Sequence, residues 1–444
     1  MSTSLQETLN PGATSAAGDL LTRSRAFDED ARQVASEARQ AFRSIRRAGT
    51  LQRNQVLLIL ADLLEKPAHQ TSLLEANERD IAAGHSNGLK PSLLERLTLT
   101  PTRIQNMASS LREIAGLPDP VGQVIEGCRL PNGLEQTKVR VPLGVLFTIY
   151  ESRPNVTIDV GALAIKSGNA AILRGGKEAV HSNTSLHALF QKALEAAGLP
   201  TNALILVRET DRAFMLALLR REESIDLVVP RGGEQLIRFI TEHSRIPVVK
   251  HDKGVCNLYV HPSGDPDMAA KIAINSKLQR TSVCNSLENL LIDANFEQAK
   301  SLLGKLAQAG AVLLGCEETV KLEPAVQAIT DPDAEYATEY LDERLSVKIV
   351  RGVDEAIDFI HRYGSGHSEA IVARDINAIQ DFRSGVDSAA VFVNCSTRFH
   401  DGGQMGMGAE VGISTGRLHV RGPMGLRDLT TTTYFVQGQG QIRE

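Results

Sequence analysis

The middle of the chain alternates short apolar runs with segments of helical spacing, and this alternation restricts the fold more than any other feature. The apolar runs lie at residues 144–150, 170–173, 203–207, 225–229 and 247–249, with helix-like segments between them. Repeated strand–helix units predict a parallel sheet that is covered by helices on both faces. Ligands of such sheets bind beyond the carboxyl ends of the strands, so the loops that follow these runs are the first places to search for a site.

The segments before this region predict helices and then a hairpin. Apolar residues recur at intervals of three and four between residues 23 and 117, which is the spacing of a buried helix face. Residues 122–140 instead hold two strand-like runs around the turn sequence Pro131-Asn132-Gly133. We expect a protruding hairpin at this place.

A second region of alternating strands and helices follows, from about residue 256 to residue 398. Its strand candidates are residues 289–292, 311–314, 347–350, 370–372 and 390–393. The tail returns to strand character at residues 430–436, and a strand at that place could pair with the hairpin. The pattern therefore predicts an α/β protein with a small additional β ribbon.

Charge and cysteine usage exclude several classes of protein. The net charge of −5 gives no basic footprint of the kind that nucleic-acid binding requires. The five cysteines are widely spaced and lack a CxxC pair, so we expect neither a zinc site nor a redox dithiol. The sequence shows no signal peptide and no run of roughly 18 apolar residues, and we expect a cytoplasmic protein without membrane attachment.

One cysteine stands out by its surroundings. Cys284 lies in the segment NSKLQRTSVCNSLEN, among polar residues and close to the cation of Arg280. Thiols in such surroundings ionise more easily and act as nucleophiles. A structural cysteine is the alternative, and the segment alone does not decide between the two. The other cysteines lie in or beside strand-like runs, where packing explains them.

Two glycine-containing segments follow predicted strands and could bind an anion. Arg174 and Lys177 flank a pair of glycines, and Gly232 and Gly233 precede a predicted helix. Glycines let the backbone approach a phosphate closely, and amides at a helix start favour anions. Solvated loops would give the same pattern, and the first strand–helix turn lacks the usual GxGxxG fingerprint. His367, in RYGSGHSEAI, fits a hydrogen-bonding loop residue better than a catalyst.

Several long segments together resemble the gamma-glutamyl phosphate reductase family of the aldehyde dehydrogenase superfamily. They are VDEAIDFIHRYGSGHSEAI, YESRPNVTIDVGALAIKSGNAAILRGGKEA, VPRGGEQLIRFI, STRFHDGG and GAEVGISTGRLHVRGPMGL. The resemblance runs from about residue 31 to residue 432 and is far more specific than any short motif. It implies an aldehyde dehydrogenase-like α/β fold with three parts. These are a Rossmann-like cofactor domain at residues 19–121 and 142–255, a catalytic α/β domain at 256–415, and an oligomerisation ribbon at 122–141 and 428–444.

The resemblance implies roles for residues that the local pattern leaves open. Cys284 matches the nucleophilic cysteine of the superfamily. Arg174 falls where a lysine usually contacts the adenosine ribose, and Lys177 falls where many NAD-preferring relatives have a glutamate. Two cations there suit the 2′-phosphate of NADPH, which is the expected cofactor, with no metal. Gly232 and Gly233 are expected to contact the cofactor as well.

Other positions depart from the superfamily or match it less closely. Lys250 stands where hydrolytic aldehyde dehydrogenases carry a general-base glutamate, and its charge would favour an anionic substrate instead. No residue aligns cleanly with their oxyanion asparagine, for which Asn155 is a candidate substitute. Glu339 is the candidate for a glutamate that contacts the nicotinamide ribose. The candidates for binding the phosphate or α-carboxylate of the substrate are Ser152, Arg153 and Arg398.

The resemblance implies reduction of L-glutamyl 5-phosphate by NADPH to L-glutamate 5-semialdehyde and phosphate, through a thioester at Cys284. This reaction is the second step of proline biosynthesis from glutamate. A homo-oligomer is expected, and glutamate 5-kinase is a candidate partner because the acyl phosphate is labile. The alternatives are a hydrolytic aldehyde dehydrogenase, a reductase of a related acyl phosphate such as a blocked glutamyl phosphate, and an inactive binding protein on the same scaffold.

Overall fold

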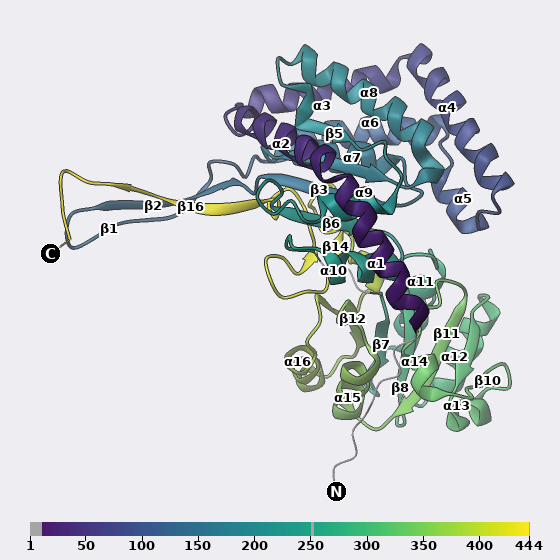
Figure 1. Cartoon of the computed structure of the whole chain (residues 1–444). Helices are drawn as coiled ribbons and strands as arrows, with labels where there is room; N and C mark the ends of the chain where they lie inside the picture. The colour runs from purple at the N-terminus through teal and green to yellow at the C-terminus, as the bar shows by residue number, and fades with distance from the viewer. Residues whose placement is uncertain (1–10, 250–252, 444) are drawn as a thin grey trace, which may run out of the picture. The chain divides into compact units, whose positions relative to one another are not determined.

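The computed structural model describes residues 11–249 and 253–443, and the chain divides into two compact units (Figure 1). The first unit comprises Met1–Val249 and Gly425–Glu444, and the second comprises Lys250–Met424. Each unit holds its own parallel sheet. Within the described residues, no helix is both long enough and apolar enough to cross a membrane.

The first unit opens with a series of helices. They are α1 (Pro11–Ala26), α2 (Asp28–Ile45), α3 (Thr50–Glu65), α4 (Pro67–Ser86), α5 (Pro91–Leu97) and α6 (Pro101–Gly116). Of these, α2 to α6 lie where the apolar spacing predicts them, whereas most of α1 precedes the predicted segment. On α3 the stripe formed by Val56, Leu57, Leu60 and Leu64 is completely buried. Side chains at these intervals share one face of a helix, so a single face supplies the core contacts.

The sheet of the first unit has four parallel strands in the order β5–β4–β3–β6. The strands are β3 (Val145–Tyr150), β4 (Ala170–Gly175), β5 (Leu204–Leu206) and β6 (Leu227–Arg231). The connecting helices are α7 (Asn155–Lys166), η1 (Lys177–Ala179), α8 (Val180–Ala196), η2 (Thr201–Ala203), α9 (Arg212–Leu218) and α10 (Glu234–His243). The strand predicted at residues 247–249 was wrong, because this segment contributes a single bridge from Val248 to Val228. Pro247 has no N–H to donate, which limits pairing at this place.

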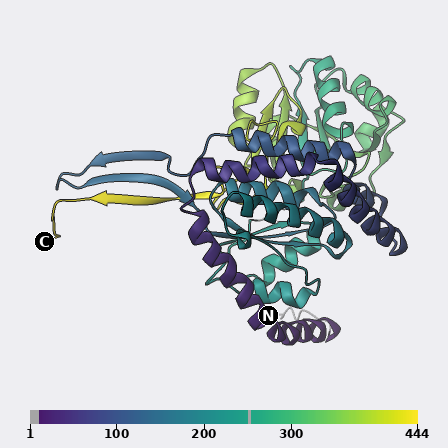
Figure 2. The same ribbon diagram turned by 90° about the horizontal axis from the view of Figure 1, so that it is seen from above.

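A three-stranded antiparallel ribbon extends from the body of the first unit (Figure 2). It consists of β1 (Val124–Arg129), β2 (Glu135–Pro142) and β16 (Thr430–Gln437). Gly133, in the turn between β1 and β2, has a φ of +84°, which glycine adopts without strain. The C-terminal tail pairs with the hairpin, as its strand pattern suggested, over the whole of β16. Val124 and Phe435 on this ribbon are each 59% exposed.

The sheet of the second unit has seven strands in the order β10–β9–β11–β8–β7–β12–β13, all parallel. The strands are β7 (Cys256–Val260), β8 (Leu287–Asp293), β9 (Val312–Gly315), β10 (Gln327–Ala328), β11 (Arg344–Val350), β12 (Ser368–Val372) and β13 (Ala390–Val393). All the strands predicted for this region are present, and β7 and β10 are additional. Leu258, Leu290 and Val347 are completely buried in its core.

Helices and short elements complete the second unit. They are α11 (Pro266–Leu278), α12 (Ala299–Gln308), α13 (Glu317–Leu322), α14 (Pro332–Tyr336), α15 (Val353–Tyr363), α16 (Ile376–Gly385), η3 (Thr397–Phe399), β14 (Ile413–Ser414) and β15 (Gly422–Pro423). The loop that carries Cys284 runs from α11 into β8, so it lies at the amino end of that strand. The strand-end rule applied to the sequence pointed to carboxyl ends instead.

Candidate active site

Cys284 lies on a backbone that is held from one side by the start of β7. Its side chain is partly exposed. Its carbonyl oxygen accepts a hydrogen bond from Cys256 Sγ at 3.1 Å. Gly254 packs against the same peptide, and a Cβ there would lie 1.8 Å from the Cys284 oxygen, so no larger residue fits. The candidate nucleophile is therefore reachable while its main chain is fixed.

The residue after Cys284 is held by the segment around η3. The Asn285 side chain is 3% exposed, and its Nδ2 donates to the carbonyl of His400 at 2.9 Å. Thr397 Oγ1 donates to the Asn285 carbonyl at 2.8 Å. These contacts and the Cys256 bond hold the loop at two successive peptides.

Arg398 brings a cation close to Cys284. Its Nε donates to Gln279 Oε1 at 2.9 Å. Burial lowers the pKa of Arg398, whereas Asp401 and the thiols of Cys284 and Cys256 act to raise it. The carbonyl oxygen of Arg398 also accepts a hydrogen bond from Asn285 Nδ2 at 3.4 Å, so the segment that carries Arg398 packs against the loop of Cys284. The structure thus brings together Cys284 and the predicted substrate residue Arg398.

Glu339 contacts the main chain of Gly254, the residue that packs against the Cys284 peptide. Its Oε1 accepts a hydrogen bond from Gly254 N at 2.9 Å, and its side chain is partly exposed. A completely buried ion pair lies nearby, in which Lys277 Nζ is 2.6 Å from Glu288 Oε2. Burial raises the pKa of Glu288 to about 7, against the opposing effect of Lys277, and the charge of Glu339 raises it further. This part of the second unit is therefore dense in charged groups.

Arg174 and Lys177 have different surroundings in the first unit. Arg174, on β4, is 8% exposed, and its Nη2 donates to the carbonyl of Thr210 at 2.6 Å. Burial lowers its pKa. Lys177 begins η1 and is exposed. Arg174 therefore supports the loop after β5, whereas Lys177 is accessible to a ligand.

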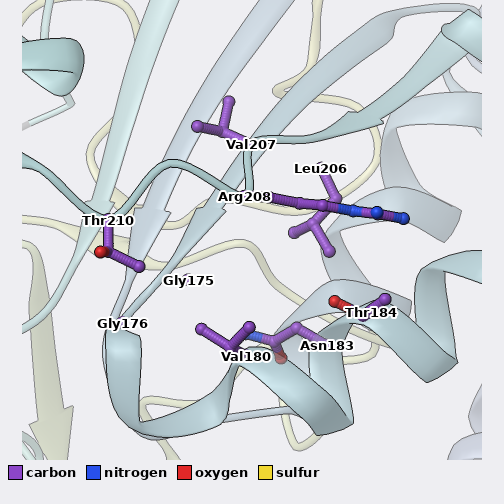
Figure 3. A pocket seen from close by; sticks show the side chains of 9 residues that line it. All are labelled: Gly175, Gly176, Val180, Asn183, Thr184, Leu206, Val207, Arg208 and Thr210. Atoms are coloured by element: carbon purple, nitrogen blue, oxygen red, sulfur yellow. The ribbon is translucent and has the colours of Figure 1, made fainter.

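A pocket lies at the carboxyl ends of β4 and β5 (Figure 3). Its lining residues are Gly175, Gly176, Val180, Asn183, Thr184, Leu206, Val207, Arg208 and Thr210. Arg208 is an exposed cation that the sequence analysis missed. It directly follows the strand predicted at residues 203–207, so the strand-end rule could have identified it.

The predicted anion-binding loop before α10 binds a carboxylate of the protein itself. Gly233 N donates to Glu151 Oε2 at 3.0 Å. A Cβ at Gly232 would lie 2.6 Å from the same oxygen. The absence of a side chain at Gly232 therefore lets a carboxylate reach the amide groups at the start of the helix.

Ser152 and Arg153 precede α7. Ser152 is 2% exposed and has a φ of +46°. Its N and Oγ both donate to Glu178 Oε1, at 2.6 and 2.9 Å. Arg153 is partly exposed, and its carbonyl accepts a hydrogen bond from Val156 N. The hydroxyl of Ser152 is thus already used within the first unit.

Asn155 begins α7, and its amide is held by an acid on the next turn. Its Nδ2 donates to Asp159 Oδ2 at 2.8 Å. Burial raises the pKa of Asp159 to about 6, although Asn155 and Arg231 favour the charged form. Lys250, the remaining predicted site residue, lies outside the described residues. Within residues 11–249 and 253–443, no group of His, Cys, Asp and Glu side chains is arranged to hold a metal ion.

The same chain is similar to proteins of one enzyme family. The sequence model of the aldehyde dehydrogenase family matches residues 2–313. A protein named gamma-glutamyl phosphate reductase from Leptospira interrogans is 52% identical over 415 residues, which are 94% of this chain and 99% of the relative. A protein of the same name from Geobacter metallireducens is 46% identical over 419 residues, which are 94% and 99% of the two chains. The chain belongs to the gamma-glutamyl phosphate reductase family.

Solved structures agree with this membership. The crystal structure of gamma-glutamyl phosphate reductase from Thermotoga maritima is 40% identical, has a TM-score of 0.89 and covers 93% of this chain and 100% of its own. An acetylating aldehyde dehydrogenase from Geobacillus thermoglucosidasius shares the fold at 18% identity, with a TM-score of 0.69 and coverage of 95% and 99%. The predicted aldehyde dehydrogenase-like α/β fold is confirmed. This member of the gamma-glutamyl phosphate reductase family is an oxidoreductase of the aldehyde dehydrogenase superfamily.

Proposed function

We propose that this enzyme reduces L-glutamyl 5-phosphate with NADPH, releases L-glutamate 5-semialdehyde and phosphate, and thereby catalyses the second step of proline biosynthesis from glutamate. The observation that carries the proposal is the 52% identity with a protein named gamma-glutamyl phosphate reductase over 94% of the chain. The partly exposed Cys284, on its fixed loop, supports a covalent mechanism.

Cys284 is the proposed nucleophile. Its thiolate attacks the acyl carbon, the bond from that carbon to the phosphate oxygen breaks, and phosphate leaves with the electron pair. NADPH, when bound, would supply the hydride that reduces the carbonyl carbon of the resulting thioester. The thiohemiacetal expels the Cys284 thiolate and releases the aldehyde. A fixed loop favours both steps, because attack requires the sulfur and the carbonyl carbon to meet in a narrow geometry.

Both steps place negative charge on the carbonyl oxygen. Arg398, whose carbonyl oxygen accepts a hydrogen bond from Asn285 beside Cys284, is proposed to stabilise this charge or to bind the departing phosphate. Losing one donor to such an oxygen typically costs about 3 kcal/mol of transition-state stabilisation. Ser152, Arg153, Asn155 and Lys250 are further candidates, on the family resemblance alone.

We propose that the pocket of the first unit binds the part of NADPH that carries its additional phosphate. Lys177 and Arg208 are exposed cations beside the carboxyl ends of β4 and β5. Arg174 Nε is buried and has no hydrogen-bond partner among the described residues. Exposed cations such as Lys177 and Arg208 bind phosphate oxygens strongly, which favours NADPH over NADH. Gly232, Gly233 and Glu339 are proposed to contact other parts of the cofactor.

We also propose an assembly of several copies and a division of labour along the chain. The exposed apolar side chains of the ribbon, at residues 122–141 and 428–444, suit contact with a second copy. Residues 19–121 with 142–255 are assigned to the cofactor, and residues 256–415 to catalysis. Glutamate 5-kinase is a candidate partner, because direct transfer would protect a labile acyl phosphate from water.

The reverse reaction tests the proposal. With L-glutamate 5-semialdehyde and NADP, formation of NADPH should require added phosphate or arsenate and should stop after one turnover per active site without either. Lys250 in place of a general base is the reason, since a positioned base typically contributes about a hundredfold to ten-thousandfold to hydrolysis. Many turnovers in phosphate-free buffer, with free glutamate as the product, would show a hydrolytic aldehyde dehydrogenase instead.

A further inference from the structure

A row of buried polar side chains leads to the carbonyl of Cys284. Cys256, His367, Ser368 and His400 are all 0% exposed. They come from the amino ends of β7 and β12 and from the residue after η3. Polar groups at this depth destabilise a fold unless they are hydrogen-bonded, so their contacts have to be specific.

The contacts form a continuous chain. Cys256 Sγ is 3.1 Å from the Cys284 oxygen and 3.7 Å from His367 Nδ1. Ser368 Oγ lies 2.7 Å from His367 Nδ1 and 2.7 Å from His400 Nδ1. The two imidazole rings have their centroids 4.8 Å apart. The serine hydroxyl therefore links the histidines, and one histidine contacts the thiol that holds Cys284.

One placement of the protons satisfies all of these contacts. The Cys256 proton is donated to the Cys284 oxygen, and the sulfur accepts from His367 Nδ1, which then carries a hydrogen. Ser368 Oγ accepts from the same N–H, and its own proton is left for His400 Nδ1. Burial raises the pKa of the Cys256 thiol well above its ordinary value. The thiol thus stays protonated and remains a donor.

We propose that Cys256 is a positioning residue for the nucleophile, and that the row His367–Ser368–His400 aims its thiol at the Cys284 carbonyl. The peptide between Cys284 and Asn285 is trans and planar, so holding its oxygen toward Cys256 turns the Asn285 N–H the opposite way. The same bond fixes the Cα of Cys284, and with it the direction in which its sulfur leaves the loop. The packing role that the sequence suggests for Cys256 is therefore incomplete.

Two substitutions at Cys256 distinguish the effect of its hydrogen bond from the effect of its packing. Cys256→Ser keeps a donor on a side chain of similar shape, whereas Cys256→Ala removes it. The inference rests on the proposed role of Cys284, so the first measurement is one that needs no turnover. It is the rate at which iodoacetamide alkylates Cys284 in the full-length protein, followed by mass spectrometry of the peptide that contains it. The second measurement is kcat and KM in the reverse reaction with NADP and phosphate.

Cys256→Ala should slow both the alkylation of Cys284 and kcat by about tenfold, the effect of losing one hydrogen bond, with KM for NADP unchanged. Cys256→Ser should remain within about threefold of the natural chain. Ser368→Ala, which leaves the thiol in place but removes the hydroxyl that links the histidines, should give a smaller slowing of the same kind. Adding it to Cys256→Ala should cause no further loss, because both changes act through one bond.

Equal rates for Cys256→Ala and the natural chain would overturn the proposal. Equal slowing by Cys256→Ser and Cys256→Ala would also overturn it, because packing alone would then explain the site. If circular dichroism shows that Cys256→Ala does not fold, the Cys256→Ser and Ser368→Ala variants decide. A normal rate of Cys284 alkylation in both variants overturns the proposal. A slow rate in Ser368→Ala alone supports it. Turnover by a Cys284→Ala variant would refute the proposed function. The alkylation rates of chains that retain Cys284 would still test the hydrogen bond from Cys256 to the Cys284 carbonyl.

Discussion

The two units present their candidate residues at opposite ends of their own strands. In the first unit, Lys177 and Arg208 follow the carboxyl ends of β4 and β5. In the second unit, Cys284 and Glu339 precede the amino ends of β8 and β11. The usual position of ligands in open α/β sheets thus describes the first unit and not the second.

The difference has electrostatic consequences. In the first unit α10 begins after the loop of Gly232 and Gly233, and the Gly233 amide donates to the carboxylate of Glu151. In the second unit a helix ends beside the loop, and the carboxyl end of a helix carries partial negative charge. An anionic thiolate there needs side-chain cations instead. Arg398, in the segment after β13, is the proposed cation, because the charge of Lys277 in the last turn of α11 is already paired with Glu288.

The largest effect should therefore come from the second unit, at Cys284. Cys284→Ala should lower turnover by several orders of magnitude, because no thioester can form. Cys128→Ala and Cys316→Ala, which change an exposed and a partly exposed thiol, should keep most of the activity. The measurement is steady-state turnover with NADP, semialdehyde and phosphate. Substantial activity in Cys284→Ala would remove the covalent mechanism and with it the contrast between the units.

The buried ion pair of the second unit should give the next largest effect. Glu288→Gln leaves the ammonium of Lys277 buried without its partner, which typically costs about 3–5 kcal/mol of folding free energy. Glu317→Gln, at the exposed pair with Lys321, should leave the denaturation midpoint nearly unchanged. Urea denaturation of both variants measures the difference. Equal midpoints would mean that the second unit does not depend on its internal charges.

Sequence patterns predicted the parts of this molecule that are set by neighbours along the chain. The strand–helix alternation, the hairpin at Gly133 and the helical stripe on α3 depend on local spacing, and all are present. The strand at residues 247–249 failed because its pairing depends on a distant partner. Cys284 was chosen from its polar surroundings together with the family resemblance.

Local sequence patterns could not predict the contacts that position the candidate site residues. Glu151 accepts a hydrogen bond from Gly233, and Glu178 accepts one from Ser152, although the two residues of each pair are far apart in sequence. His367 looks like a loop residue in the sequence, yet it is completely buried at the start of β12. Which polar side chains are buried together is decided by how the strands pair, and the order β7–β12 in the sheet is not visible in the spacing.

A buried acid of the second unit should make its stability depend on pH. Glu369 is 0% exposed, and burial raises its pKa to about 8, against the hydrogen bonds from Asn257 and Ser388. The folded state then binds a proton that the unfolded state has lost, so stability is highest below the ordinary pKa of glutamate and falls as pH rises through about 8. Between pH 6 and 9 the loss should be roughly 3 kcal/mol, since about two pH units lie between pH 6 and the folded pKa and each unit is about 1.4 kcal/mol.

Glu369→Gln tests this effect by removing the ionisable group while keeping a similar shape. Urea denaturation at several pH values should show a flatter profile for the variant than for the natural chain. The comparison between the two chains cancels the other groups that titrate in this range. Parallel profiles would mean that the carboxyl of Glu369 is ionised throughout, and that the buried interior of the second unit tolerates its charge.

The smallest effect should arise in the first unit, where the candidate cations are exposed. Lys177→Gln and Arg208→Gln should each raise the KM for NADPH by about tenfold and leave that for NADH within about twofold, because a charge-assisted bond to the 2′-phosphate contributes roughly 1.5 kcal/mol. Their unfolding midpoints should stay unchanged, since both side chains are exposed. Initial rates with each cofactor measure the ratio.

Arg174→Gln provides the contrast within the same strand end. Its guanidinium is buried and donates to the carbonyl of Thr210, so its loss should lower the unfolding midpoint as well as the preference for NADPH. A lower midpoint with an unchanged NADPH preference would make Arg174 a support of the loop and leave recognition of the 2′-phosphate to Lys177 and Arg208. An unchanged preference in all three variants would show that the pocket at β4 and β5 does not bind the 2′-phosphate. The Gly233 amide at the start of α10 would then be the next candidate for anion binding in the first unit, because it already donates to the carboxylate of Glu151.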